Sequence, residues 1–196
     1  RGAEAVALVD DCLPRARRAT GPRLADSRVQ SVAAQVYDRN GLPAKAEPLR
    51  RAQVETAKQT YGPGSTQHVS SLGLLGDNLL RQRKWSAAEE CCREVVAILE
   101  NRAPPPPVVF VARSQLGSSL LGQKKYEEAE PLLRAGYEGM ARRARAGESL
   151  NADRLPAVAE QLAALYAATK RPEEAAKWRA ERAKYPFVAP PPRAKP

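Results

Sequence analysis

Apolar positions along this chain recur with the period of an α-helix. Between residues 29 and 37 the apolar side chains stand mostly three or four positions apart, at Val29, Val32, Ala33, Val36 and Tyr37. That spacing places them on one face of a helix. The same pattern predicts helices over residues 3–19, 27–40, 44–60, 65–83, 86–100, 108–123, 127–145, 151–169 and 172–184. Asp26 or Ser27 is the expected cap of the second of these helices.

The predicted helices repeat as pairs. An alanine lies near the start of the second helix of each pair, at Ala5, Ala46, Ala88, Ala129 and Ala175, in steps of 41, 42, 41 and 46 residues. Another small residue precedes each full copy by 12 positions, at Ala34, Gly76, Gly117 and Ala163. A fixed period of this length indicates stacked supersecondary units. Small residues on two successive helices let the backbones approach closely, so we expect helical hairpins that cross at these positions.

The segment Tyr126-Glu127-Glu128-Ala129-Glu130-Pro131-Leu132 carries a family resemblance. It resembles the tetratricopeptide repeat, in its variety of about 42 residues that occurs in kinesin light chains and many bacterial proteins. The resemblance implies an all-α fold, a right-handed α-solenoid of stacked helix-turn-helix hairpins. It implies a truncated repeat at 1–20, full repeats at 21–61, 62–102, 103–145 and 146–185, and a Pro-rich disordered tail at 186–196. The half repeat at 1–20 suggests the C-terminal part of a longer protein.

Composition restricts the functional class. The chain is 43% hydrophobic and 28% charged, as soluble folded proteins are, and it shows neither an apolar run long enough to span a membrane nor a signal peptide. We expect a cytoplasmic bacterial protein without cofactors. Three cysteines cannot form a disulfide framework, and Cys12 and either Cys91 or Cys92 are expected in the helical core.

The net charge of +10 suggests nucleic acid as one possible partner. The densest arginine clusters, 15–18 and 142–145, however, fall late in predicted second helices. Arginine near a helix C-terminus complements the helix dipole, and no aromatic side chains alternate with these arginines to stack on bases. The structural interpretation is therefore favoured over nucleic-acid binding.

No catalytic or metal-binding constellation is visible. His68 is the only histidine, it opens a predicted helix, and we expect it to be solvated at a capping turn. A nucleophile would need a base beside it, and a metal would need more ligands than one histidine and a cysteine pair. Acidic pairs such as Glu89-Glu90, Glu127-Glu128 and Glu173-Glu174 recur at one place in the repeat, which is typical of scaffolding. The sequence predicts no enzyme.

What remains is a binding surface. A stack of hairpins presents its first helices on a concave face, and the resemblance implies a protein or peptide partner there. The expected partner-binding residues are Arg28, Ser31, Gln35, Ser70, Asp77, Ser114, Ser118 and Glu160. We predict a non-catalytic docking or scaffold module. The alternative is a regulatory or substrate-docking arm of a larger bacterial serine/threonine kinase, whose C-termini the segment 172–181 resembles. The predicted helix at 3–19 lacks the first helix against which it would pack, and its uncovered apolar face also suggests self-association.

Overall fold

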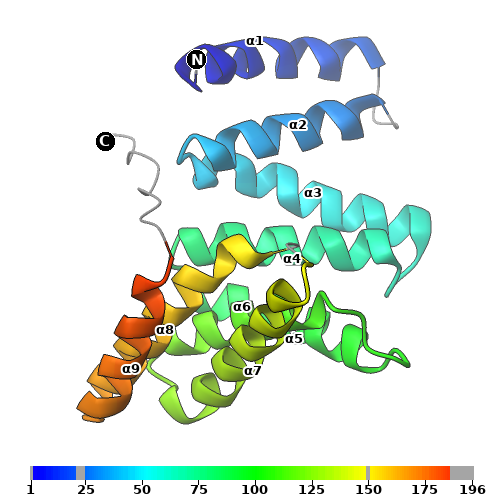
Figure 1. Ribbon diagram of the computed structural model, residues 1–196. Coiled ribbons are helices and arrows are strands. Elements are labelled where there is room, and N and C mark those ends of the chain that lie inside the picture. Colours follow the sequence, from blue (N-terminus) through cyan, green and yellow to red (C-terminus); the bar gives the residue numbers. More distant parts are fainter. Residues whose placement is uncertain (1, 21–24, 149–150, 186–196) are drawn as a thin grey trace. The chain divides into compact units, whose positions relative to one another are not determined.

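The computed structural model of the chain describes residues 2–20, 25–148 and 151–185, without the side chains of residues 16–20 and 25–27. Within those ranges the secondary structure is helical and contains no strand (Figure 1). The tail at 186–196, which was predicted to be disordered, lies outside the described residues.

The helices belong to two compact units, with the boundary between Gln82 and Arg83. The first unit contains α1 (Gly2–Thr20), α2 (Ala25–Arg39), α3 (Pro43–Tyr61) and α4 (Thr66–Arg81). The second contains α5 (Trp85–Glu100), α6 (Val109–Gly122), α7 (Tyr126–Arg145), the short 3₁₀ helix η1 (Ala152–Arg154), α8 (Leu155–Ala168) and α9 (Pro172–Ala183). Every predicted helix is present within a few residues of its expected ends. One detail was wrong: α2 already includes Asp26 and Ser27, so neither precedes it as a cap.

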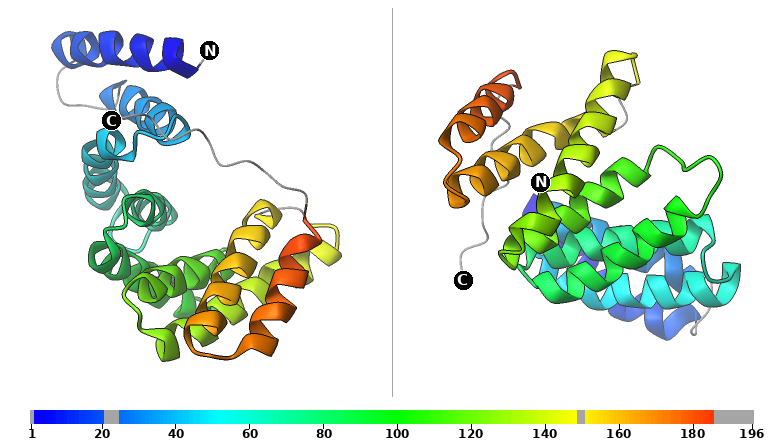
Figure 2. Two further views of the ribbon diagram at one scale, coloured as in Figure 1. Left: turned by 90° about the vertical axis from the view of Figure 1, so that its left-hand side faces the viewer. Right: turned by 90° about the horizontal axis from the view of Figure 1, so that it is seen from below.

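The helices alternate between two kinds, which we call first helices (α2, α4, α6 and α8) and second helices (α1, α3, α5, α7 and α9). Figure 2 shows α6 beside α7 and α8 beside α9 as antiparallel hairpins of the second unit. In the first unit, α3 packs against both α2 and α4, and α1 packs against α2.

One turn conformation closes the first helices. The residue seven positions after each small crossing residue has a left-handed φ, at Gly41 (73°), Arg83 (59°), Lys124 (63°) and Lys170 (58°). The next amide then bonds back across the helix end, as the N–H of Leu42 does to the carbonyl of Tyr37 at 2.9 Å and that of Lys125 to Leu120 at 2.9 Å. This is the Schellman closure, which satisfies carbonyls that the helix leaves unpaired. Its recurrence supports the repeat register.

The small residues predicted at the crossings are buried. Ala34, Gly76, Gly117 and Ala163 are buried on the first helices, and Ala46, Ala88, Ala129 and Ala175 are buried on the second. A Cβ added to Gly117 of α6 would stand 2.7 Å from Leu133 Cγ and 3.0 Å from the Leu133 backbone nitrogen of α7. The two backbones therefore touch at this crossing, and only a residue without a side chain fits there.

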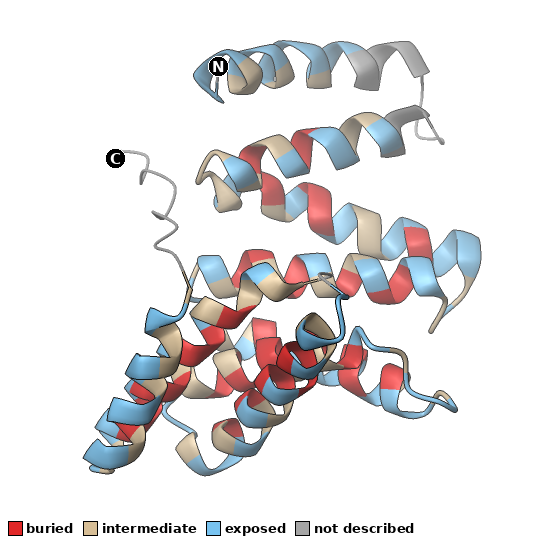
Figure 3. Ribbon diagram, in the orientation of Figure 1, coloured by how far each residue is buried: buried red, intermediate tan, exposed pale blue. Residues whose placement is uncertain are grey.

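The three cysteines differ in their surroundings. Cys92 is buried in the core of the second unit, as expected, and Cys91 is half-buried. Cys12 is exposed, so the prediction of a core position was wrong for this residue. The reason is visible in Figure 3, where no described residue of α1 is coloured as buried: within its unit α1 packs mainly against α2, with a smaller contact to α3 through Asp10 and Lys45.

Candidate functional site

Two hollows are described in the first unit. The connection between α3 and α4 forms one edge of the more polar of the two. Gly62 ends α3 with a φ of 86°, and the Ser65 hydroxyl oxygen accepts a bond from the His68 N–H at 3.2 Å. The Gly64 N–H in turn donates to Nδ1 of His68 at 3.2 Å. His68 is 1% exposed, so the expectation of a solvated histidine was wrong. Its ring instead holds the end of α3 beside the start of α4.

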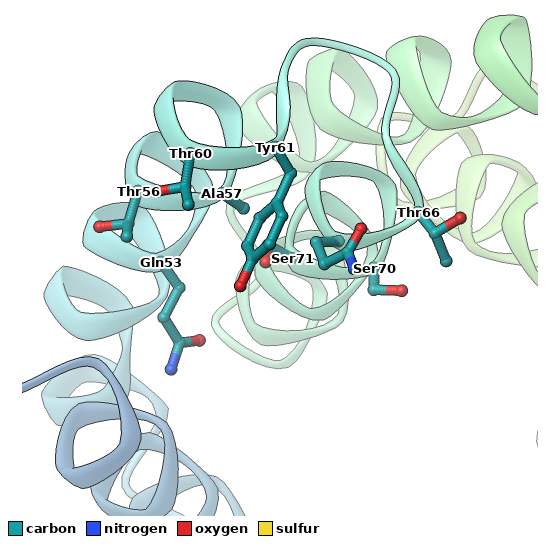
Figure 4. A pocket seen from close by; sticks show the side chains of 9 residues that line it. Gln53, Thr56, Ala57, Thr60, Tyr61, Thr66, Ser70 and Ser71 are labelled. Carbon is teal, nitrogen blue, oxygen red and sulfur yellow. The ribbon is translucent and has the colours of Figure 1, made fainter. Parts of the chain in front are cut away.

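A hollow of about 370 Å³ opens between these two helix ends. Its walls are uncharged, and although most of the exposed lining is carbon, eight of the nine residues carry a hydroxyl or a carboxamide. They are Gln53, Thr56, Ala57, Thr60 and Tyr61 of α3 and Thr66, Gln67, Ser70 and Ser71 of α4. We call these nine residues the hydroxyl hollow. Figure 4 shows Gln53 and Tyr61 pointing to the same side of α3, and Tyr61 is exposed over 54% of its surface. Hydroxyls and carboxamides both donate and accept hydrogen bonds, so the hollow suits an uncharged polar ligand.

Gln53 contributes a donor that nothing else in its surroundings uses. Nη1 of Arg50 donates to Oε1 of Gln53 at 3.0 Å. Because a guanidinium only donates, this contact fixes which end of the carboxamide is the oxygen. The opposite end, Nε2, is buried and has no hydrogen-bond partner among the described residues. A buried polar group without a partner is costly, and Gln53 is one of the residues that line the hollow.

Arg50 is itself held rigidly. It is 4% exposed, and its Nε and Nη2 donate to Oδ2 of Asp38 on α2 at 3.1 and 2.9 Å. Nδ2 of Asn78 on α4 donates to the other oxygen of Asp38 at 2.6 Å. The network ties three helices together and orients Gln53. Sequence reasoning missed it, although one signal was present: Arg50 occupies a repeat position at which α1, α5 and α7 carry Val9, Cys92 and Leu133.

The five partner-binding residues predicted in the first unit occupy different places. Ser70 lines the hydroxyl hollow, whereas Arg28 lines an apolar groove between α1 and α2. Ser31 and Gln35 are exposed on α2. Asp77 is half-buried and pairs with Arg81 at 2.9 Å. Of the five, only Ser70 therefore lies in the hydroxyl hollow.

The three residues predicted in the second unit differ in accessibility. Ser114 is buried, and its hydroxyl donates to the Val111 carbonyl of its own helix at 2.8 Å, so it cannot line a surface. Ser118 is half-buried, with its hydroxyl 2.8 Å from Oε1 of Gln161. Glu160 is exposed at the edge of a hollow of about 550 Å³ between α8 and α9. The first helix α6 is enclosed by α5, α7 and α8, which explains the burial of Ser114.

A recurring glutamate joins successive hairpins, and of the acidic pairs predicted to be structural it includes Glu89. Three of the five crossing alanines are followed by a glutamate, and each of these accepts a hydrogen bond from the next hairpin: Glu47 from Gln82 (2.8 Å), Glu89 from Gln123 (2.6 Å) and Glu130 from Tyr166 (2.8 Å). Burial raises the pKa of Glu89, but hydrogen bonds from Lys125 and Gln123 outweigh it and lower that pKa to about 2. These three glutamates join hairpins and do not line the hydroxyl hollow.

The described ranges, 2–20, 25–148 and 151–185, also bear on metal binding and membrane insertion. They contain no group of three His, Cys, Asp or Glu side chains that could hold a metal ion. None of their helices is long and apolar enough to cross a membrane.

Comparison with known proteins identifies the fold. No protein-family model and no curated protein matches the chain. Among solved structures, a kinesin-light-chain-like protein of Podospora anserina with nearly identical TPR-like repeats is 20% identical, with a TM-score of 0.66 over 93% of this chain and 86% of that one. A variant of the same protein with a single substitution gives a TM-score of 0.68 at 20% identity, over 93% and 85% of the two chains.

BtubC (BKLC) from P. vanneervenii is also similar, at 20% identity and a TM-score of 0.67, over 100% of this chain and 79% of that one. Identities at this level show a shared fold, and they agree with the period, the crossings and the turns described above. The chain therefore has the all-α tetratricopeptide-repeat fold of kinesin-light-chain-like proteins.

Proposed function

We propose that the chain is a non-catalytic docking module that binds an extended, uncharged segment of a partner protein in the hydroxyl hollow. The observation that carries this proposal is the buried Nε2 of Gln53, a fixed donor without a partner in a wall of hydroxyls. An extended peptide has backbone carbonyls and amides that are not paired within the segment, and these are the groups that such a wall can bind.

The partner's chemistry follows from the lining. No lysine, arginine, aspartate or glutamate belongs to the hydroxyl hollow, so charge contributes little to binding there. Tyr61 offers an exposed ring whose face can cover an apolar or proline side chain of the segment, and aromatic side chains are common anchors at interfaces. Ser31 and Gln35 on α2, with Ser70 on α4, support a path along the first helices of this unit.

Variants of the hollow test this function. Short peptides displayed on phage would be selected against the whole chain, and their affinities measured by calorimetry. Gln53→Glu keeps an acceptor for Arg50 but removes the free donor, and it should weaken binding about tenfold or more. Ser70→Arg should also weaken binding by filling the hollow.

Ser86→Arg is the matched control, because it introduces the same charge at an exposed serine of α5 in the other unit. It should leave the affinities unchanged. Binding should depend only weakly on salt. Equal affinities for both hollow variants and the control would refute the proposed site, and a steep loss of binding with salt would indicate an acidic or nucleic-acid ligand instead.

A further inference from the structure

Ser86 carries an exposed hydroxyl group in the second unit. It lies in the first turn of α5, directly after Trp85, with which the helix begins. The other serines and threonines whose side chains the structure describes in this unit are buried or half-buried: Ser114, Ser118, Ser119 and Thr169. An enzyme can therefore reach the hydroxyl oxygen of Ser86 from outside the fold more easily than any of these.

The other second helices of this unit carry glutamate at the repeat position of Ser86. Counted from the crossing alanines, the equivalent residues are Glu127 in α7 and Glu173 in α9. Both of those helices have acidic residues in the first turn, whereas α5 has none, and its N-cap residue makes no side-chain capping bond. A negative charge in the first turn is favourable, because it opposes the positive end of the helix dipole. A phosphate on Ser86 would give α5 the charge that α7 and α9 have in their sequence.

Two cations stand shortly before Ser86 in the chain. Arg83 and Lys84 precede it by three and two positions, and both are exposed. Arg83 has a left-handed φ of 59°, a conformation that glycine adopts without strain, so arginine at this turn contributes its charge. The turns before α7 and α9 also carry basic pairs, but glutamate follows each of them at the third position. Among these three turns, only the one before α5 therefore combines a basic pair with a hydroxyl group.

We propose that Ser86 is phosphorylated by a protein kinase that selects basic residues before its target serine, as kinases select substrates by charge patterns. The hydroxyl oxygen of Ser86 attacks the γ-phosphorus of ATP, and the bond from that phosphorus to the bridging oxygen of the β-phosphate breaks. ADP leaves, and the hydroxyl proton passes to the base of the kinase. The phosphate then stabilises the first turn of α5. The hydroxyl hollow belongs to the first unit, so this modification is independent of the proposed docking function.

The thermal midpoint of the second unit tests the effect of the charge. It can be followed by the fluorescence of Trp85 and Trp178. Phosphorylation of Ser86 and the variant Ser86→Glu should both raise the midpoint, by roughly 1–5 °C. Asn101→Glu is the control, because it places the same charge at the C-terminal end of α5, where it should lower the midpoint. A midpoint that falls on phosphorylation would contradict the equivalence of Ser86 with the glutamates of α7 and α9.

Treatment of the whole chain with ATP and a purified kinase of this preference tests the site itself. Mass spectrometry should find a phosphate on the peptide that contains Ser86, and Ser86→Ala should abolish it. Arg83→Gly removes one cation and suits the left-handed φ, so it should slow this reaction at least about tenfold while the fold is kept. Lys170→Gly makes the same change at the equivalent turn before α9 and should leave the rate unchanged. A chain that takes no phosphate at Ser86, or a rate that both glycine variants lower equally, overturns the proposal.

Discussion

Replacing Gly117 by alanine tests the central crossing of the repeat. Alanine is the better helix former by about 1 kcal/mol, so in an open helix the change would stabilise the protein. At Gly117 the new Cβ would lie 2.7 Å from Leu133 Cγ and 3.0 Å from the Leu133 backbone nitrogen. The Leu133 side chain can rotate, but the backbone can move only if α7 shifts away from α6. Overpacking of this kind typically costs about 1–3 kcal/mol, which equals or exceeds the gain in helix propensity.

We therefore expect Gly117→Ala to lower stability by up to about 2 kcal/mol, or by up to roughly 8 °C in the thermal midpoint. Tryptophan fluorescence is a suitable probe, because Trp85 and Trp178 both lie in the second unit. Gly73→Ala in α4 is the control, since a Cβ there meets nothing within 4 Å, and it should raise the midpoint followed by circular dichroism. If both substitutions raise stability, α6 and α7 do not meet backbone to backbone and the repeat register is wrong.

Three further predictions concern the buried network, the hairpin ties and the turns. Asp38→Ala removes the carboxylate that pairs with the buried guanidinium of Arg50. It should lower the free energy of unfolding measured in urea by about 3–5 kcal/mol, and the double variant with Arg50→Leu should recover most of that loss. The pKa of Glu89 is lowered to about 2, so its contribution to stability is complete above pH 4.5 and is lost as the pH falls towards 2; Glu89→Gln should flatten that part of an acid titration. Lys124 has a φ of 63°, so Lys124→Gly should raise the urea midpoint, by up to about 1 kcal/mol in stability.

The helices and their crossings could be read from the sequence because both are set locally. Helical periodicity depends on residues three and four apart, and a small residue is needed wherever two backbones touch. The positions of Ala46, Ala129 and Gly117 were therefore sufficient to place the hairpins. The left-handed turns were not predicted, because three of the four closing residues are Arg83, Lys124 and Lys170, which carry no signal of a positive φ.

The tertiary structure decided which residues are buried. The sequence shows which residues share a face of a helix, but it does not show whether another helix covers that face. Cys12 and Cys92 have similar apolar surroundings in sequence, but only Cys92 is covered. Ser114 sits at a surface position of the repeat and is buried because three helices enclose α6. His68 is buried in a position where its ring accepts a hydrogen bond from the backbone amide of Gly64.

The hydroxyl hollow depended on tertiary structure most of all. Gln53 and Ser70 are separated by a helix end and a turn, and nothing local links them. They line one cavity because the α3–α4 turn sets two helix ends side by side and because Asp38, on a third helix, holds the arginine that orients Gln53. The sequence alone determined a repeat of helical hairpins, and only the packing of those hairpins decided which polar side chains are left facing a space that a partner can fill.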